Sequence, residues 1–155
     1  MDIYRAATDY TRQLFRGMEI VEVYPNLFQS SAIRFPWDEK KIRELGINVV
    51  IDLAGGFDPH MKFLDQYLYW PFEDKEELPD LNSLKTVAKF GKANLLCNKR
   101  VLTHCTAGYN RSGLVNAMIL MIYLGFRGPR AIESVRQARP GALYNQTFVN
   151  YLNKF

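Results

Sequence analysis

The sequence is poor in cysteine and has no long apolar run. Only two cysteines, Cys97 and Cys105, occur among its 155 residues, which is too few for a disulfide framework and fits a reducing compartment. No stretch of about 18 or more apolar residues could span a bilayer. The first residues show no signal-peptide pattern, because Asp2, Arg5 and Asp9 interrupt any apolar stretch. We therefore expect a soluble, cytoplasmic protein without stable membrane insertion.

The chain also lacks a linker and a strong excess of charge. No Pro/Gly/Ser-rich or low-complexity segment divides it, and 155 residues with 48% apolar content can bury one core. This predicts a single domain over residues 1–155. A formal net charge of +4 favours anionic partners in general. Without a run of basic residues, it is too mild to indicate nucleic acid by itself.

What the chain does contain is the stretch His-Cys-Thr-Ala-Gly-Tyr-Asn-Arg-Ser at residues 104–112. A thiolate rather than a thiol attacks phosphorus, and amide dipoles, a cation or a helix N-terminus can stabilise it. A short buried strand is expected before Cys105 and a long apolar helix after it, so this residue lies where a strand turns into a helix. The backbone N–H groups of residues 106–111 can then surround one anion, with Gly108 allowing a backbone angle that other residues resist.

The side chains of this stretch suggest separate roles in phosphoryl transfer. Arg111 offers a planar fork that can bind two phosphoryl oxygens at once, which lysine cannot copy. The Ser112 hydroxyl can hydrogen-bond to the Cys105 sulfur, and His104 is expected to orient the loop rather than to transfer protons. The alternative is a buried structural cysteine beside a helix N-cap. The predicted substrate-binding residues, besides Arg111, are Thr106, Ala107, Gly108, Tyr109 and Asn110.

The pattern Cys-x5-Arg-Ser, with His before it and Gly at its fourth position, resembles that of the cysteine-dependent protein tyrosine phosphatases, and in particular their small dual-specificity branch. Further likeness lies in residues 24–30, 45–53 and 139–148. The resemblance implies a phosphatase catalytic domain that hydrolyses phosphomonoesters through a phosphocysteine intermediate, without a metal or another cofactor. It implies phosphotyrosine proteins as substrates, with phosphoserine and phosphothreonine proteins beside them. No aromatic clamp for phosphotyrosine is evident, so we expect a shallow pocket.

This mechanism needs a carboxylic acid on a separate loop to protonate the leaving group. In the family the acid is an aspartate in a Pro-apolar-x-Asp context upstream of the cysteine, and Asp74 matches both context and spacing. The same residue would later act as a base toward water, which Gln146 would position unless it only occupies the first turn of a terminal helix. Asp80 suits a helix N-cap. The local rivals of Asp74 are Glu73, Glu76 and Glu77.

Two other functions stay open. Asn110 replaces the serine that many members carry before the arginine. In the RNA 5′-triphosphatase relatives the motif ends in a similar way, with Asn before Arg. RNA or another anionic phosphate substrate is therefore an alternative. A non-catalytic module that binds phosphate is the second, although such a module has no chemical need for the Cys105 thiol. Oxidation could join that thiol to Cys97 in a disulfide. The commoner explanation for a cysteine such as Cys97 is a buried thiol near the end of a helix.

Strand and helix patterns alternate along the chain. We expect helices at 4–15, 38–45, 80–97, 112–124, 129–138 and 145–153, and strands at 18–24, 27–29, 47–53, 67–70 and 100–104. This order predicts a single α/β domain with a mostly parallel central sheet flanked by helices on both faces. Ligands bind outside the carboxyl ends of such strands, where Cys105, Asp74 and Gly55–Gly56 would meet. Substrate choice is expected to depend on loops such as residues 57–60.

Overall fold

The computed structural model describes residues 19–34, 38–56 and 61–155. The helix expected at 4–15 and the loop at 57–60 lie outside these residues. The strands are β1 (Ile20–Tyr24), β2 (Leu27–Ser30), β3 (Val49–Asp52), β4 (Gln66–Tyr69) and β5 (Val101–His104). They form one sheet in the order β1-β2-β5-β3-β4, in which β1 is antiparallel to β2 and the other four strands are parallel. The prediction of a mostly parallel α/β sheet is confirmed.

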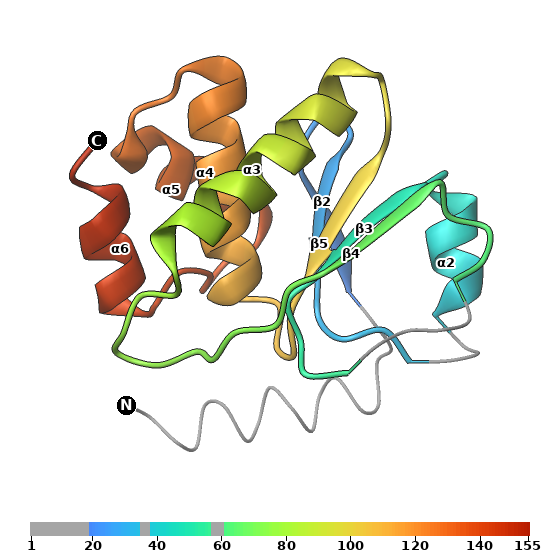
Figure 1. Cartoon of the computed structure of the whole chain (residues 1–155), viewed down its shortest axis with the longest axis horizontal. Coiled ribbons are helices and arrows are strands. Elements are labelled where there is room, and N and C mark those ends of the chain that lie inside the picture. The colour runs from blue at the N-terminus through green and yellow to red at the C-terminus, as the bar shows by residue number, and fades with distance from the viewer. Residues whose placement is uncertain (1–18, 35–37, 57–60) are drawn as a thin grey trace.

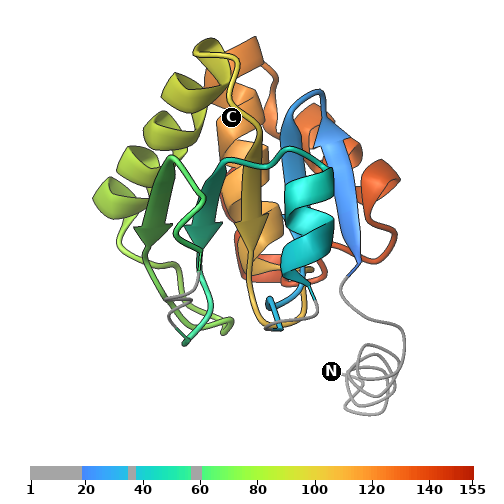
Figure 2. The same ribbon diagram turned by 90° about the vertical axis from the view of Figure 1, so that its right-hand side faces the viewer.

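Helices cover both faces of this sheet, as predicted. They are α2 (Glu39–Glu44), α3 (Leu81–Leu96), α4 (Arg111–Leu124), α5 (Gly128–Ala138) and α6 (Gln146–Leu152). Figure 1 shows α2 on one face and the other four helices on the opposite face. In Figure 2, α2 lies in front of the sheet and the arrowheads of β3, β4 and β5 point to the same lower edge. The loops that follow these strands therefore lie near one another.

The two faces of the sheet bury separate apolar clusters because side chains alternate along a strand. Val101 and Ile51 belong to the cluster under α3 to α6, while Leu102 and Val50 belong to the cluster under α2. Helix α4 is buried over most of its length and carries no charge after Arg111. This buried helix anchors the C-terminal end of the loop between β5 and α4. Within the part of the chain that the structure describes, no helix combines the length and apolar character needed to cross a membrane.

The Cys97 thiol is exposed, so the expectation of a buried thiol at this position is wrong. Cys97 caps the C-terminus of α3, where the chain leaves the apolar face of the helix and turns through Asn98 (φ 57°). Strand β5 lies between the two cysteines in sequence and spans about 13 Å at about 3.3 Å per residue. Cα atoms joined by a disulfide lie within about 7 Å. This fold therefore keeps Cys97 away from Cys105.

The predicted N-cap at Asp80 is present, and it gives a pH-dependent stability. The Asp80 carboxylate accepts a hydrogen bond from Ser83 N–H at 2.8 Å, and hydrogen bonding by the Ser83 side chain and backbone lowers the pKa of the carboxyl. A lowered pKa in the folded state adds stability above the ordinary value near 4, and that stability is lost as the pH falls through the folded-state pKa. We expect Asp80→Ala to lower Tm at neutral pH and to leave it unchanged near pH 2. A difference in Tm that is the same at both pH values would contradict this prediction, which thermal unfolding checks.

Candidate active site

Cys105 directly follows β5 and precedes α4, at the edge of the sheet where the parallel strands end. Its side chain is 2% exposed. The Sγ atom lies 3.3 Å from Ser112 Oγ and accepts a hydrogen bond from Gly108 N–H at 3.3 Å. Donors at the sulfur and the nearby helix N-terminus are features that favour a thiolate. The structure thus places the predicted nucleophile and its predicted hydroxyl partner in contact.

Residues 105–111, here called the cysteine loop, pack at Gly108 against the backbone of Ser30 and Ser31. This glycine has φ 76°, and a Cβ atom on it would lie 2.6 Å from Ser31 N and 2.7 Å from Ser30 C. Backbone atoms at this distance cannot move aside as a flexible side chain would. The Gly108 carbonyl accepts a hydrogen bond from the buried Gln29 side chain at 3.0 Å, and Asn116 in turn donates to Gln29 at 3.2 Å. The loop shape therefore depends on close packing against the end of β2.

The Arg111 guanidinium joins three parts of the site. Its Nη1 atom donates to the Phe72 carbonyl at 2.9 Å and to the Leu53 carbonyl, after β3, at 3.3 Å. Its Nε atom is buried and has no hydrogen-bond partner among the described residues. A guanidinium whose Nε–H is not used by the protein can donate it to a phosphoryl oxygen.

Asp74 contacts the cysteine loop through two asparagines. Its Oδ2 atom accepts a hydrogen bond from Asn110 Nδ2 at 2.9 Å, and its Oδ1 atom accepts one from Asn145 Nδ2 at 2.8 Å. Asn110 Oδ1 also accepts the backbone N–H of Asn145 at 2.9 Å. We call Asp74, Asn110 and Asn145 the Asp74 clamp. The clamp connects residues 70–80, here called the acid loop, to the cysteine loop and to the start of α6.

The other acids of the acid loop do not contact the cysteine loop. Glu73 and Glu77 form ion pairs with Lys75, and their side chains are 76% and 77% exposed. The Lys75 hydrogen bond lowers the pKa of Glu73. Glu76 is exposed. Among these acids, Asp74 is the one that is hydrogen-bonded to the cysteine loop.

Gln146 begins α6, where its exposed side chain donates to Asn150 at 2.7 Å. The residue before it, Asn145, supplies the contact with Asp74. Sequence reasoning missed Asn145, although its position immediately before a helix, where its side chain accepts the N–H groups of Thr147 and Phe148, is typical of an N-cap. The N-cap pattern could have singled out this residue, but not its long-range contact.

His104 lies on β5 beneath the loop and is 1% exposed. Its Nε2 atom is 3.4 Å from Oδ1 of the fully buried Asp52 on β3. Asp52 also accepts hydrogen bonds from the Ala54 N–H at 2.9 Å and from the Tyr67 hydroxyl. These contacts join side chains of the three adjacent strands β5, β3 and β4. They fit an orienting rather than a proton-transferring role for His104.

Two tyrosines lie at the rim of the site. The rings of Tyr109, in the cysteine loop, and Tyr144 are 6.2 Å apart, and Tyr144 is 57% exposed. The Arg139 guanidinium packs over the other ring, 4.3 Å from the Tyr109 centroid. Burial raises the pKa of the Tyr144 phenol, and the negative charges of Asp74 and Cys105 raise it further. Sequence reasoning missed Tyr144 because no local pattern marks it as part of the site.

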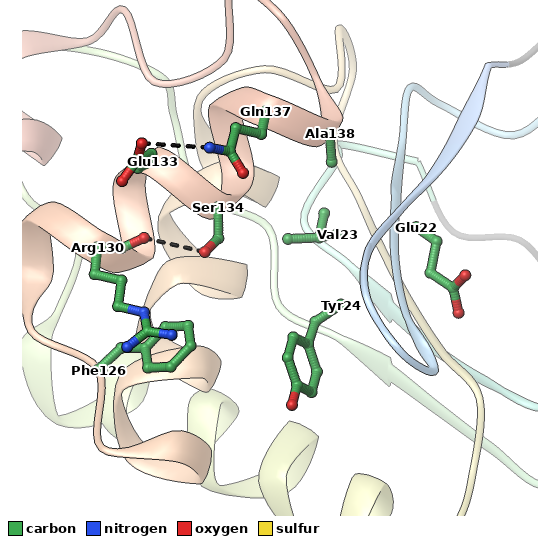
Figure 3. A pocket seen from close by; sticks show the side chains of 9 residues that line it. All are labelled: Glu22, Val23, Tyr24, Phe126, Arg130, Glu133, Ser134, Gln137 and Ala138. Carbon is green, nitrogen blue, oxygen red and sulfur yellow. Dashed lines mark hydrogen bonds between the residues drawn. The ribbon is translucent and has the colours of Figure 1, made fainter.

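A groove of about 530 Å³ lies between β1 and α5. Figure 3 shows Tyr24 from β1 and Arg130 from α5 among its lining residues. The Arg130 guanidinium lies 4.0 Å from the centroid of the Phe126 ring. None of the lining residues belongs to the cysteine loop or the acid loop. This groove is therefore separate from the candidate active site. Within the described residues, no three His, Cys, Asp or Glu side chains are grouped so that they could hold a metal ion.

Comparison with known proteins agrees with this arrangement. The family described as dual specificity phosphatase, catalytic domain, matches residues 27–155. Human dual specificity protein phosphatase 4 is 28% identical over 135 residues, which cover 87% of this chain and 34% of that protein. The chain therefore spans about a third of the length of this curated relative.

Solved structures show the same fold. The crystal structure of human DUSP28 has a TM-score of 0.77 and 26% identity, covering 87% of this chain and 90% of that one. A mouse putative dual specificity phosphatase complexed with zinc tungstate also gives 0.77 and 26%, covering 87% and 84%. Since the family match includes every segment that forms the site described above, the chain belongs to the dual specificity phosphatase family, of which it carries the catalytic domain.

Proposed function

We propose that this protein is a metal-independent phosphomonoester hydrolase that acts on phosphorylated proteins through a phosphocysteine at Cys105. The observation that carries the proposal is that separate segments contribute a nucleophile, an anion-binding guanidinium and an acid to one site. Cys105 Sγ accepts a hydrogen bond from Gly108 N–H and contacts Ser112 Oγ, both at 3.3 Å. The Arg111 Nε–H has no partner among the described residues, and Asp74 is hydrogen-bonded to the cysteine loop.

In the first step, the Cys105 thiolate attacks phosphorus, so that an S–P bond forms and the P–O bond to the leaving group breaks. Asp74 gives its proton to the leaving oxygen. The Arg111 fork and the backbone N–H groups of residues 106–111 bind the equatorial phosphoryl oxygens, whose charge they stabilise in the transition state. The products are a dephosphorylated hydroxyl group and phosphocysteine.

In the second step, water attacks the phosphocysteine and the S–P bond breaks. The Asp74 carboxylate accepts a proton from this water, which restores the acid for the next cycle. The Ser112 hydroxyl, 3.3 Å from Cys105 Sγ, donates to the departing sulfur. Inorganic phosphate then leaves the loop, and the thiolate is free again.

The rim supports phosphotyrosine as one substrate. Tyr144 is 57% exposed and its ring pairs with that of Tyr109, so the two offer an aromatic surface beside the cysteine loop. Aromatic rings pair favourably in offset or edge-to-face arrangements. Such a surface at a rim contacts a phosphotyrosine ring without requiring a deep pocket, which leaves room for phosphoserine and phosphothreonine.

Asn110, the residue that left RNA open as a substrate, makes contacts within the protein. Its amide nitrogen donates to Asp74 at 2.9 Å and its amide oxygen accepts from Asn145 N–H at 2.9 Å. The side chain is also 2% exposed. Both polar ends of Asn110 are thus engaged within the protein, so its presence no longer favours RNA over phosphoprotein.

Asn145 is a positioning residue in this proposal, and Asn145→Ser tests it. Serine retains the helix cap but is too short to donate to Asp74. We expect kcat to fall about tenfold on a phosphoserine peptide, whose leaving group needs the proton, and less than about twofold on p-nitrophenyl phosphate. Steady-state kinetics on the two substrates measure this difference, with Asn150→Ser on the exposed side of α6 as the control. An equal loss on both substrates would contradict the positioning role.

The function itself is tested by phosphate release with reductant and a chelator present. The substrates are a phosphotyrosine peptide, a phosphoserine peptide and a 5′-triphosphate RNA, and acid quenching of radiolabelled substrate traps the phosphocysteine. Turnover of a peptide with label on Cys105 supports the proposal. Release from the RNA alone would replace phosphoprotein as the substrate, and tight binding without release from any substrate would indicate a phosphate-binding module.

A further inference from the structure

A second, smaller groove lies on the helical side of the molecule, away from the cysteine loop. It has a volume of about 220 Å³ and is lined by residues of α3, α4 and the C-terminal segment that includes α6. Figure 1 shows α3 running across α4, with α6 near them. The surface exposed in the groove is apolar, and Met118, Met121 and Ile122 of α4 contribute to it. Methionine side chains adapt to irregular apolar partners.

The rim of this groove is positive. Lys85 and Lys89, one turn apart on α3, line the groove, and both are exposed. Neither lysine forms an ion pair within the ranges that the structure describes. Helices α3, α4 and α6 contain no Asp or Glu. An occupant with negative charge beside an apolar group therefore complements both properties of the groove.

Tyr151 adds an aromatic ring to the same wall. Its side chain lines the groove and is 5% exposed. Its hydroxyl is buried and has no hydrogen-bond partner among the described residues, while its ring contacts that of Phe155 at 5.4 Å. A buried phenol usually finds a hydrogen-bond partner. The groove exposes no polar surface, however, so Tyr151 contributes its ring to the apolar wall and not its hydroxyl.

We propose that this groove is a docking site for an acidic segment of a partner protein, which inserts one large apolar side chain between α3, α4 and the C-terminal segment. The volume is below the range of about 300 to 1,000 Å³ typical of small-molecule pockets, and it suits a single anchoring side chain. The two lysines at the rim pair with carboxylates that flank this anchor. The site goes beyond the proposed hydrolase activity and does not depend on it.

The experiment measures fluorescence anisotropy of the whole protein with a fluorescein-labelled peptide, Ac-Asp-Glu-Asp-Phe-Glu-Asp-Glu. Excess inorganic phosphate is present to occupy the cysteine loop, so that the result does not depend on turnover. We expect Lys85→Glu/Lys89→Glu to weaken binding about tenfold or more, since reversal replaces two attractions with repulsions. The matched control is Lys40→Glu/Lys62→Glu, two exposed lysines outside the groove, which makes the same change in net charge.

Variants of the peptide and of the groove residue Met121 test the apolar contact and the charge contact separately. Replacing the peptide phenylalanine by alanine, or the protein residue Met121→Ala, is expected to weaken binding about fivefold, because each change removes apolar contact. Equal weakening by both lysine pairs would show only an effect of net charge and would overturn the proposal. Equal binding of a peptide with Gln and Asn in place of its acids would also overturn it. Thermal unfolding of each variant confirms that it is folded.

Discussion

Cys105→Ser is expected to abolish phosphate release, with a loss on the order of 10⁴-fold or more in kcat. Serine has nearly the shape of cysteine and can keep the contacts with Gly108 N–H and Ser112 Oγ that the sulfur makes. An alkoxide, however, does not form without a base, and the nearby His104 ring faces Asp52 instead, at 3.4 Å. Single-turnover kinetics measure the loss, and titration with tungstate tests whether the anion cradle still binds.

The control for this substitution is Cys97→Ser, since Cys97 is an exposed thiol in the same chain. We expect this variant to keep its activity and to remain sensitive to a thiol-alkylating reagent. A Cys105→Ser protein that retained more than about a hundredth of the wild-type rate would contradict a covalent mechanism at this residue. Loss of tungstate binding would instead show that serine had disturbed the cysteine loop.

Asp74→Asn is expected to lower kcat by about 10² to 10⁴ on substrates with poor leaving groups and to change the Kd for substrate little. The amide has the size of the carboxylate but cannot release a proton at neutral pH. It also meets two amide donors, Asn110 Nδ2 and Asn145 Nδ2, with only one oxygen. A series of aryl and alkyl phosphates with leaving groups of increasing basicity measures the effect, which should grow along the series.

Glu73→Gln and Glu76→Gln provide matched controls from the same acid loop. Both residues are exposed, and neither contacts the cysteine loop, so each variant is expected to retain the wild-type rate. A loss below about threefold for Asp74→Asn on the poorest leaving group would remove Asp74 from the role of general acid. A large loss for Glu73→Gln would move that role to its neighbour.

Much of the fold follows from local sequence patterns. The apolar run after Cys105 predicts a buried helix, and α4 indeed begins at Arg111, one residue before the expected start, because Leu114 N–H bonds to the Asn110 carbonyl. Alternating strands and helices predict the parallel sheet. Asp80 is recognisable as an N-cap because its partner, Ser83, is only three residues away.

The parts that sequence reasoning missed depend on contacts between distant segments. Asn145 is 71 residues from Asp74 along the chain, and no periodicity within a helix or strand brings them together. The exposure of Cys97 depends on where α3 ends relative to the core. Tyr144 lies at the rim because its ring pairs with that of Tyr109, from which α4 and α5 separate it in sequence. Periodicity predicts which elements form, but the geometry of their packing decides which side chains meet.

The double use of the Arg111 guanidinium has a thermodynamic consequence. Its Nη1 donates to the Phe72 carbonyl of the acid loop, and in the proposed mechanism the rest of its fork binds the phosphate. In that mechanism one side chain both hydrogen-bonds to the acid loop and binds the ligand, so the position of the loop and the binding of phosphate are linked equilibria. By reciprocity, the factor by which phosphate favours the ordered acid loop equals the factor by which the ordered loop favours phosphate. A molecule that binds the outer side of residues 70–80 and favours one position of the acid loop would thereby change the affinity for phosphate without entering the cysteine loop.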